Sequence, residues 1–213
     1  MTTSSKPRGP YAKTAAKREA IAEAARAIVL QKGHRGLTTA EVAERAGMSE
    51  RAMLYHFPTR DHLLIAAIER QDISTGSGIP TTAVTDELVD VPTIIARRGM
   101  GEVELLRLFG YLDSAAQDPE HPAHDYMTQH TKRSIEGFAT LVRHRQEAGL
   151  AHPDIDPTTA ARQIVATWRG LQSMWLADPG FDLADEVSQA FRRLTGQPTM
   201  EARSLLGDLL TKI

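Results

Sequence analysis

The sequence predicts an all-α protein, and three observations lead to this fold class. Apolar residues recur at spacings of three and four along most of the chain, as they do on one face of a helix. No segment shows a convincing period of two, which a half-buried strand requires. Glycines and prolines stand where the apolar stripes stop, at the usual places of helix ends. The 213 residues, 41% apolar and 24% charged, suffice for one or two globular domains with a sizeable core.

The first predicted helix lies between Lys13 and Lys32. Gly33 follows where a helix C-terminus favours glycine, and Lys32 complements the negative end of the helix dipole. Because this helix is long, it can support shorter helices that are unstable alone. Its apolar stripe consists of Ile21, Ala24, Ala25, Ile28 and Val29.

Residues 38–57 predict two short helices with a tight turn between them. Thr38 or Thr39 is suited to cap the first helix, which ends at Gly47, and Ser49 is suited to cap the second. Two short helices joined by a turn of about three to four residues that contains glycine form a helix-turn-helix. The small core between them is expected to contain Val42, Ala46, Met48 and Met53, and Phe57 is expected in the core as well.

The remaining chain predicts a loop and then further helices. Residues 74–91 contain Gly76, Gly78 and Pro80 and predict a mobile loop between two domains. Asp156 and Asp182 are suited to cap two of the later helices. These helices are expected around Leu105–Leu112 and at about 122–149, 157–178, 183–196 and 199–210.

Charge and composition restrict the class of function. Residues 1–74 hold 12 Lys and Arg against 8 Asp and Glu, a net charge of +4, whereas residues 75–213 hold 13 against 19, a net charge of −6. A basic front on an acidic body indicates that the front meets a polyanion. The absence of cysteine excludes disulfides, thiol catalysis and cysteine-ligated zinc. With no apolar run long enough to span a membrane and no secretory signal pattern, we expect a cytoplasmic protein without a membrane partner.

Residues 38–64 resemble the TetR family of transcriptional repressors. The stretch reads TTAEVAERAGMSERAMLYHFPTRDHLL, in which helix, turn, serine cap, Tyr-His-Phe, a basic residue, an acid and Leu-Leu follow in the family's order. The resemblance extends over about residues 13–68. It implies an N-terminal three-helix DNA-binding domain and a larger helical domain for ligand binding and dimerisation, with domains at 1–12 (a disordered basic arm), 13–60 and 61–213.

The resemblance also implies roles for single residues. Glu50, Arg51 and Ala52 are expected to face base edges in the major groove, where the Arg51 guanidinium is suited to bind guanine twice. Two residues differ from common family members: Leu54 stands where a tyrosine is frequent, and Arg51 where glycine is frequent. Contacts with phosphates are implied for Thr39, Ser49, Tyr55, His56 and Arg60.

The later helices offer candidate residues for an effector site, and the resemblance implies a dimer. The apolar seam of the helix at 157–178 suits the core of the fold and a partner helix equally well, and the resemblance to the TetR family implies a homodimer through the helices at 157–178 and 183–195, with Gly170 permitting close approach. A small-molecule effector of unknown identity is expected to release the protein from a pseudo-palindromic operator in double-stranded DNA. Each residue of the candidate effector pocket has bundle core as its alternative role, and the set is Phe109, Leu112, Tyr126, His130, Phe138, Trp168, Gln172 and Trp175.

Two other functions remain open at this point. One is a DNA-binding module that responds to no ligand. The other is a metal-dependent enzyme that uses His121, His124 and His130, since imidazole suits zinc or iron. No phosphate-binding loop, nucleophile elbow or helical pair of histidines four residues apart supports an enzyme. We therefore expect a regulator without enzymatic activity, cofactor or metal.

Overall fold

The computed structural model describes residues 10–74 and 90–210, with side chains for residues 13–72 and 90–206. Every regular element in these ranges is a helix, which confirms the all-α prediction. The predicted basic arm and the predicted loop at 74–91 lie largely outside the described residues. The chain divides into two compact units, the first made of residues 1–76 and 107–124 and the second of 77–106 and 125–213.

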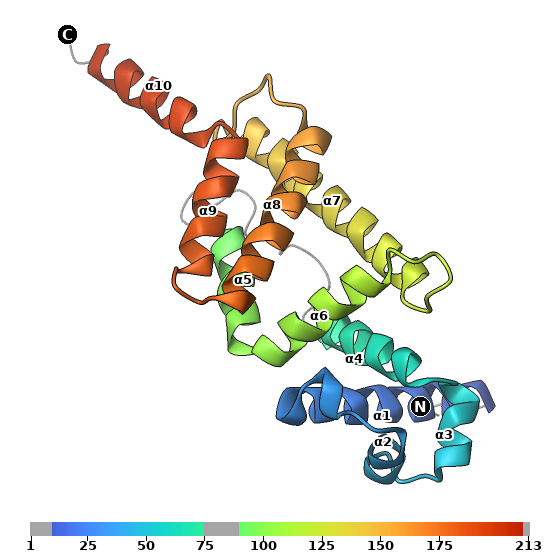
Figure 1. The fold of residues 1–213 in the computed structure, drawn as a ribbon. Coiled ribbons are helices and arrows are strands. Elements are labelled where there is room, and N and C mark those ends of the chain that lie inside the picture. Colours follow the sequence, from blue (N-terminus) through green and yellow to red (C-terminus); the bar gives the residue numbers. More distant parts are fainter. Residues whose placement is uncertain (1–9, 75–89, 211–213) are drawn as a thin grey trace, which may run out of the picture. The chain divides into compact units, whose positions relative to one another are not determined.

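The first unit contains the predicted helix-turn-helix. Helix α4 lies along α1, and the short α2 and α3 pack beside them (Figure 1). Gly33, which ends α1, has φ 73°, a left-handed conformation that costs glycine little. The described elements of this unit are α1 (Pro10–Lys32), a 3-10 turn (His34–Gly36), α2 (Thr39–Arg45), α3 (Glu50–His56) and α4 (Arg60–Ser74).

The apolar stripe of α1 forms the centre of this unit. Ile21, Ile28 and Val29 are fully buried, as the helical spacing predicts, and they share the core with Leu63 and Leu64 of α4. The predicted domain boundary after residue 60 stays a prediction, but the compact unit that holds the helix-turn-helix continues through α4.

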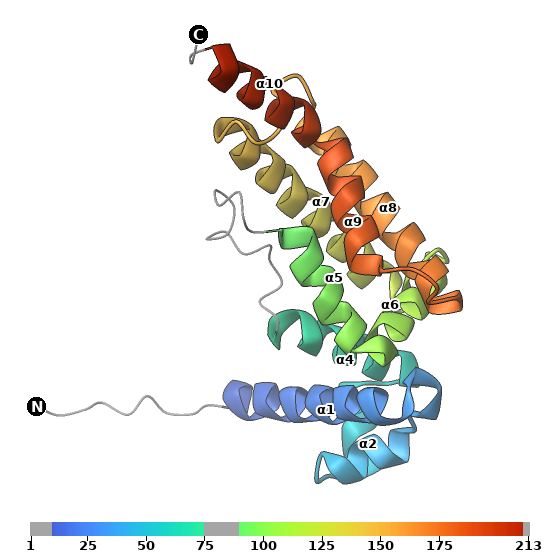
Figure 2. The same cartoon turned by 90° about the vertical axis from the view of Figure 1, so that its left-hand side faces the viewer.

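The second unit is a layered helical bundle. Helix α9 lies beside both α8 and α5, and α10 continues beyond the end of α9 (Figure 2). Residues of α6 from Arg107 onwards belong to the first unit. The helices of this part of the chain are α5 (Val91–Gly101), α6 (Val103–Ala115), α7 (His124–Glu147), α8 (Pro157–Ala177), α9 (Leu183–Leu194) and α10 (Gln197–Leu210).

Aspartate side chains cap α5, α8 and α9. The Asp156 carboxylate accepts a hydrogen bond of 2.7 Å from the Thr159 backbone N–H, and bonds from the Thr159 side chain and backbone lower the pKa of Asp156 below its usual value. Asp182 caps α9 in the same way. Helix α5 is not predicted from the sequence, and Asp90 caps it by accepting a bond of 3.1 Å from the Thr93 backbone N–H.

The core of the second unit joins α5, α7, α8 and α9. Val142 and Ala161 are fully buried there, and Phe138 is 8% exposed. None of the helices in the described ranges is both long and apolar enough to cross a membrane.

Candidate nucleic-acid interface

Two side-chain caps and one glycine build the helix-turn-helix as the sequence predicts. The Thr38 hydroxyl accepts a bond of 3.3 Å from the Glu41 backbone N–H at the start of α2. Gly47 has φ 68° in the turn, and the Ser49 hydroxyl accepts a bond of 3.3 Å from the Ala52 backbone N–H at the start of α3. These caps satisfy backbone donors that a helix leaves without partners.

Packing decides which face of α3 is presented to solvent. Val42 of α2 and Met53 of α3 are fully buried, and Phe57, directly after α3, is 5% exposed, so its predicted place in the core is confirmed. Ala46 and Met48, predicted in the same core, are only partly buried. The opposite face of α3 presents Glu50, Arg51, Ala52 and Tyr55.

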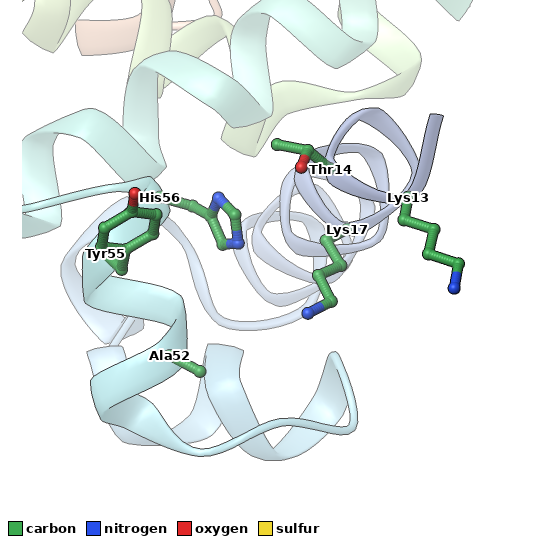
Figure 3. Close-up of a pocket in the computed structure, with 6 residues that line it drawn as sticks. All are labelled: Lys13, Thr14, Lys17, Ala52, Tyr55 and His56. Atoms are coloured by element: carbon green, nitrogen blue, oxygen red, sulfur yellow. The ribbon is translucent and has the colours of Figure 1, made fainter. Parts of the chain in front are cut away.

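A groove of 390 Å³ lies between the N-terminal half of α1 and α3. Figure 3 shows that the amino group of Lys17 points into the space between the two helices, and that the His56 ring extends from α3 towards α1. The Tyr55 side chain is 86% exposed and also lines the groove. The lining residues are Lys13, Thr14, Lys17, Ala52, Tyr55 and His56.

Thr14 and Lys17 are not among the DNA-contact residues predicted from the sequence. Lys13 and Lys17 are four residues apart and therefore lie on one face of α1. Both are exposed, in a stretch where every described side chain from residue 13 to residue 20 is exposed. The lysine spacing was visible in the sequence, but the position of α1 next to α3 was not.

The C-terminal end of α3 is attached to α1 by Arg18. The Arg18 guanidinium donates a bond of 2.9 Å to the His56 carbonyl oxygen, and its carbon lies 4.3 Å from the centre of the Phe57 ring. A cation at this end complements the negative pole of the helix dipole. Arg18 thereby links the C-terminal end of α3 to α1.

Two residues that are predicted to contact phosphates make bonds within the protein. The Arg60 guanidinium donates to the carbonyl oxygens of Leu37, at 3.1 Å, and of His34. The Thr39 hydroxyl donates to the Glu50 carboxylate. The expected contacts of all eight residues with DNA stay predictions, but the structure gives Arg60 and Thr39 intramolecular partners.

The bonds of Arg60 lead to a prediction about stability. Arg60→Ala is expected to lower the free energy of unfolding by about 1.5–3 kcal/mol, because hydrogen bonds from a charged donor to half-buried carbonyls are lost. Arg35→Ala, which removes the same charge from an exposed site on the 3-10 turn, should change it by no more than about 0.5 kcal/mol. Thermal unfolding measures both. A fully stable Arg60→Ala variant that binds all DNA weakly would instead support a phosphate contact.

The end of α6 and the following turn also belong to this unit. The Tyr111 hydroxyl lies 3.4 Å from Asp61 Oδ1, and His121 Nε2 lies 3.7 Å from Asp61 Oδ2. The Tyr111 and His34 rings stack with centroids 5.1 Å apart. Asp61, in the first turn of α4, is thus in contact with the segment that leads towards the second unit.

The candidate effector residues are divided between the two units. Phe109 and Leu112 belong to the first unit and the other six to the second. In the second unit, Trp168 Nε1 donates a bond of 3.0 Å to the Gln172 side chain, which in turn lies 3.4 Å from the Leu106 carbonyl oxygen. The Tyr126 and His130 rings lie 6.2 Å apart. Phe138 packs in the core, and Trp175 is partly buried.

The alternative metal site gains no support from the geometry. His124 Nδ1 lies 2.8 Å from the Ala116 carbonyl oxygen, and His121 Nδ1 accepts a bond of 3.1 Å from the Ala123 backbone N–H. Across the described part of the chain, no group of three or more histidine, aspartate or glutamate side chains is arranged to hold a metal ion.

Comparison with known proteins extends these observations. Residues 21–67 match the model of the bacterial regulatory proteins of the tetR family. The chain is 24% identical over 178 residues to the A-factor receptor protein of Streptomyces griseus, a match that covers 82% of this chain and only 60% of that protein. It is 25% identical over 173 residues to the HTH-type transcriptional regulator PksA of Bacillus subtilis, a match that covers 76% of this chain and 80% of PksA.

Solved structures share the fold. A TetR-family transcriptional regulator from Rhodococcus sp. superimposes with a TM-score of 0.67 at 24% identity, over 85% of this chain and 99% of that one. SmeT, the repressor of the SmeDEF multidrug efflux pump of Stenotrophomonas maltophilia, does so with a TM-score of 0.59 at 19% identity, over 85% and 89%.

Proposed function

We propose that this chain, whose helix-turn-helix domain is of the TetR family of bacterial regulatory proteins, is a cytoplasmic, dimeric transcriptional repressor that a small molecule releases from its operator. The observation that carries the proposal is the exposed face of α3 beside a groove with two lysines. Arg51 on that face is suited to read guanine, while Lys13 and Lys17 are placed to neutralise phosphates.

The proposed dimer joins two such domains through α8 and α9. Ala166, Gly170 and Ser173 are exposed on α8, and Met174 beside them is 61% exposed. Small residues at this spacing permit close approach of a partner helix, and burial of Met174 adds apolar area. Two recognition helices in one symmetric dimer then read half-sites about one helical turn apart or a multiple of it.

The proposed release requires an effector that prefers a second conformation. The Trp168 and Gln172 pair on α8 supplies an apolar ring and a polar group of the kind that orients small ligands. One relative is called the receptor for A-factor, which favours a ligand response over a DNA-binding module without one. Asp61, with its contacts to Tyr111 and His121, offers a route by which a shift of α6 changes α4.

Selection from a random pool of DNA fragments tests the proposal. The purified chain is expected to enrich a pseudo-palindrome whose half-site centres are about 10–10.5 base pairs apart, or a multiple of this. Light scattering should show a dimer, and screening of small molecules against the selected site should find one that releases it. Failure to enrich any sequence would overturn the proposal.

The lysine groove predicts the effect of one substitution. Lys17→Ala is expected to weaken binding to all DNA sequences by a similar factor and to reduce the slope of log affinity against log salt by about 0.9 for each domain on the DNA. The control is Lys132→Ala, which removes the same charge from an exposed site on α7 in the second unit. Equal losses of DNA affinity in the two variants would indicate a general effect of charge and no phosphate contact by Lys17.

A further inference from the structure

Glu50 is an unexpected residue on a surface that approaches DNA. It is the first residue of α3, it is exposed, and it shares the exposed face with Arg51. An ionised carboxylate only accepts hydrogen bonds, and it is repelled by phosphates. On this face its charge therefore weakens DNA binding unless it meets a hydrogen-bond donor.

Thr39 holds this carboxylate in place. Its hydroxyl, on the first residue of α2, donates to Oε1 of Glu50, the first residue of α3. A hydroxyl has one proton, so in this arrangement Thr39 does not also donate to a phosphate. The bond uses one acceptor site of a carboxylate that has about four, and the others remain available to a donor from outside.

The donors in the major groove are few. Guanine presents only acceptors there, thymine presents an acceptor and a methyl group, and cytosine presents its N4 amino group. Adenine presents an amino group beside the N7 acceptor, which repels a carboxylate and suits an amide side chain instead. Among the four bases, cytosine is the best match for a carboxylate held in a fixed position.

We propose that Glu50, positioned by Thr39, is a specificity-determining residue that accepts a hydrogen bond from the cytosine amino group at one position of each operator half-site. The inference rests on the proposed function and names what α3 reads in addition to the guanine expected for Arg51. Repulsion between the carboxylate and acceptor edges rejects the other bases, so Glu50 contributes more to discrimination than to affinity.

The alternative role of Glu50 is local. A carboxylate in the first turn of a helix stabilises it through the helix dipole, whether or not DNA is present. Under that role, substitutions of Glu50 change the stability of the protein and leave its base preference unchanged. The two roles are therefore separable by the sequence that each variant selects.

The test selects DNA from one random pool with the wild type and with Glu50→Gln, Glu50→Ala and Thr39→Val, and sequences the products. The wild type is expected to enrich cytosine at one position of each half-site. Glu50→Gln should change this preference to adenine, because an amide pairs with adenine N6 and N7. Glu50→Ala should lose the preference there, by roughly 5- to 150-fold in discrimination, and bind random DNA more tightly.

Two further variants isolate the mechanism. Thr39→Val should reduce discrimination at the cytosine position alone, whereas loss of a phosphate contact would weaken binding to every sequence alike. Glu44→Ala removes the same charge from an exposed site on α2 and should leave the selected sequence unchanged. Thermal unfolding verifies that each variant is folded.

The outcomes distinguish this inference from the function on which it rests. A folded Glu50→Gln variant that selects the same sequence as the wild type overturns the role of Glu50 and leaves the repressor intact. A change in the selected base from cytosine to adenine at one position supports the role of Glu50. A wild type that enriches no sequence overturns the proposed function, and the role of Glu50 with it.

Discussion

Raising the salt concentration from about 50 to about 200 mM is expected to weaken operator binding at least about 100-fold. Lys13 and Lys17 line the groove beside α3, so a dimer presents four such lysines to the DNA backbone. Each neutralised phosphate contributes about −0.9 to the slope of log affinity against log salt, and four give about −3.6. Fluorescence anisotropy on a labelled operator measures this slope directly.

The same titration on the Lys17→Ala variant serves as the internal control. Its slope should be shallower than that of the wild type by about 1.8 for the dimer, because two phosphate contacts are absent. A wild-type affinity that does not change with salt would contradict DNA binding through this groove. A steep slope that Lys17→Ala leaves unchanged would place the phosphate contacts elsewhere.

Met53→Ala is expected to destabilise the first unit by about 2–5 kcal/mol. The Met53 side chain is fully buried in the small core between α2 and α3, and its truncation leaves a cavity that two helices of seven residues each cannot close without losing their packing. Because neither helix is stable alone, operator affinity should fall together with stability. Hydrogen exchange of the backbone amides in residues 38–57 measures the loss in this unit separately from the second.

A matched control is available on α10. Met200 is only partly buried, so Met200→Ala should have a much smaller effect and should leave exchange in residues 38–57 unchanged. If Met53→Ala retained both exchange protection and operator affinity, the burial of Met53 would not be what stabilises the recognition helix.

Helix ends and apolar stripes were predictable because the interactions that form them are local. The caps at Thr38, Ser49 and Asp156 each accept a hydrogen bond from the residue three positions later, so residue type and spacing predict them, although they suit Thr39 as well as Thr38 for the first cap. The buried stripe of α1 follows from the helical period in the same way. Helix α5 was not predicted, since it directly follows a segment with glycines and a proline and itself contains Pro92, Gly99 and Gly101.

The site was predictable only where a motif encodes it. The order of residues from Thr38 to Leu64 located the recognition helix, and the face that presents Arg51 follows from which side of α3 is apolar. The candidate effector residues were chosen from aromatic positions alone. The structure shows that Phe138 packs in the core and that Trp168 and Gln172 are hydrogen-bonded.

By itself the sequence determined an all-α chain, its capped helices and the position of the helix-turn-helix, because these depend on contacts between near neighbours in the chain. Tertiary structure decided three contacts between residues far apart in the chain. Arg18 bonds to His56, 38 residues away, and Arg60 bonds to Leu37, 23 residues away. Thr39 bonds to Glu50, 11 residues away. Tertiary structure also decided that Lys17 and His56 line the same groove. The physical reason is that the packing of α1 against α2 and α4 sets these distances, and the spacing of residues along one helix does not tell which other helix it packs against.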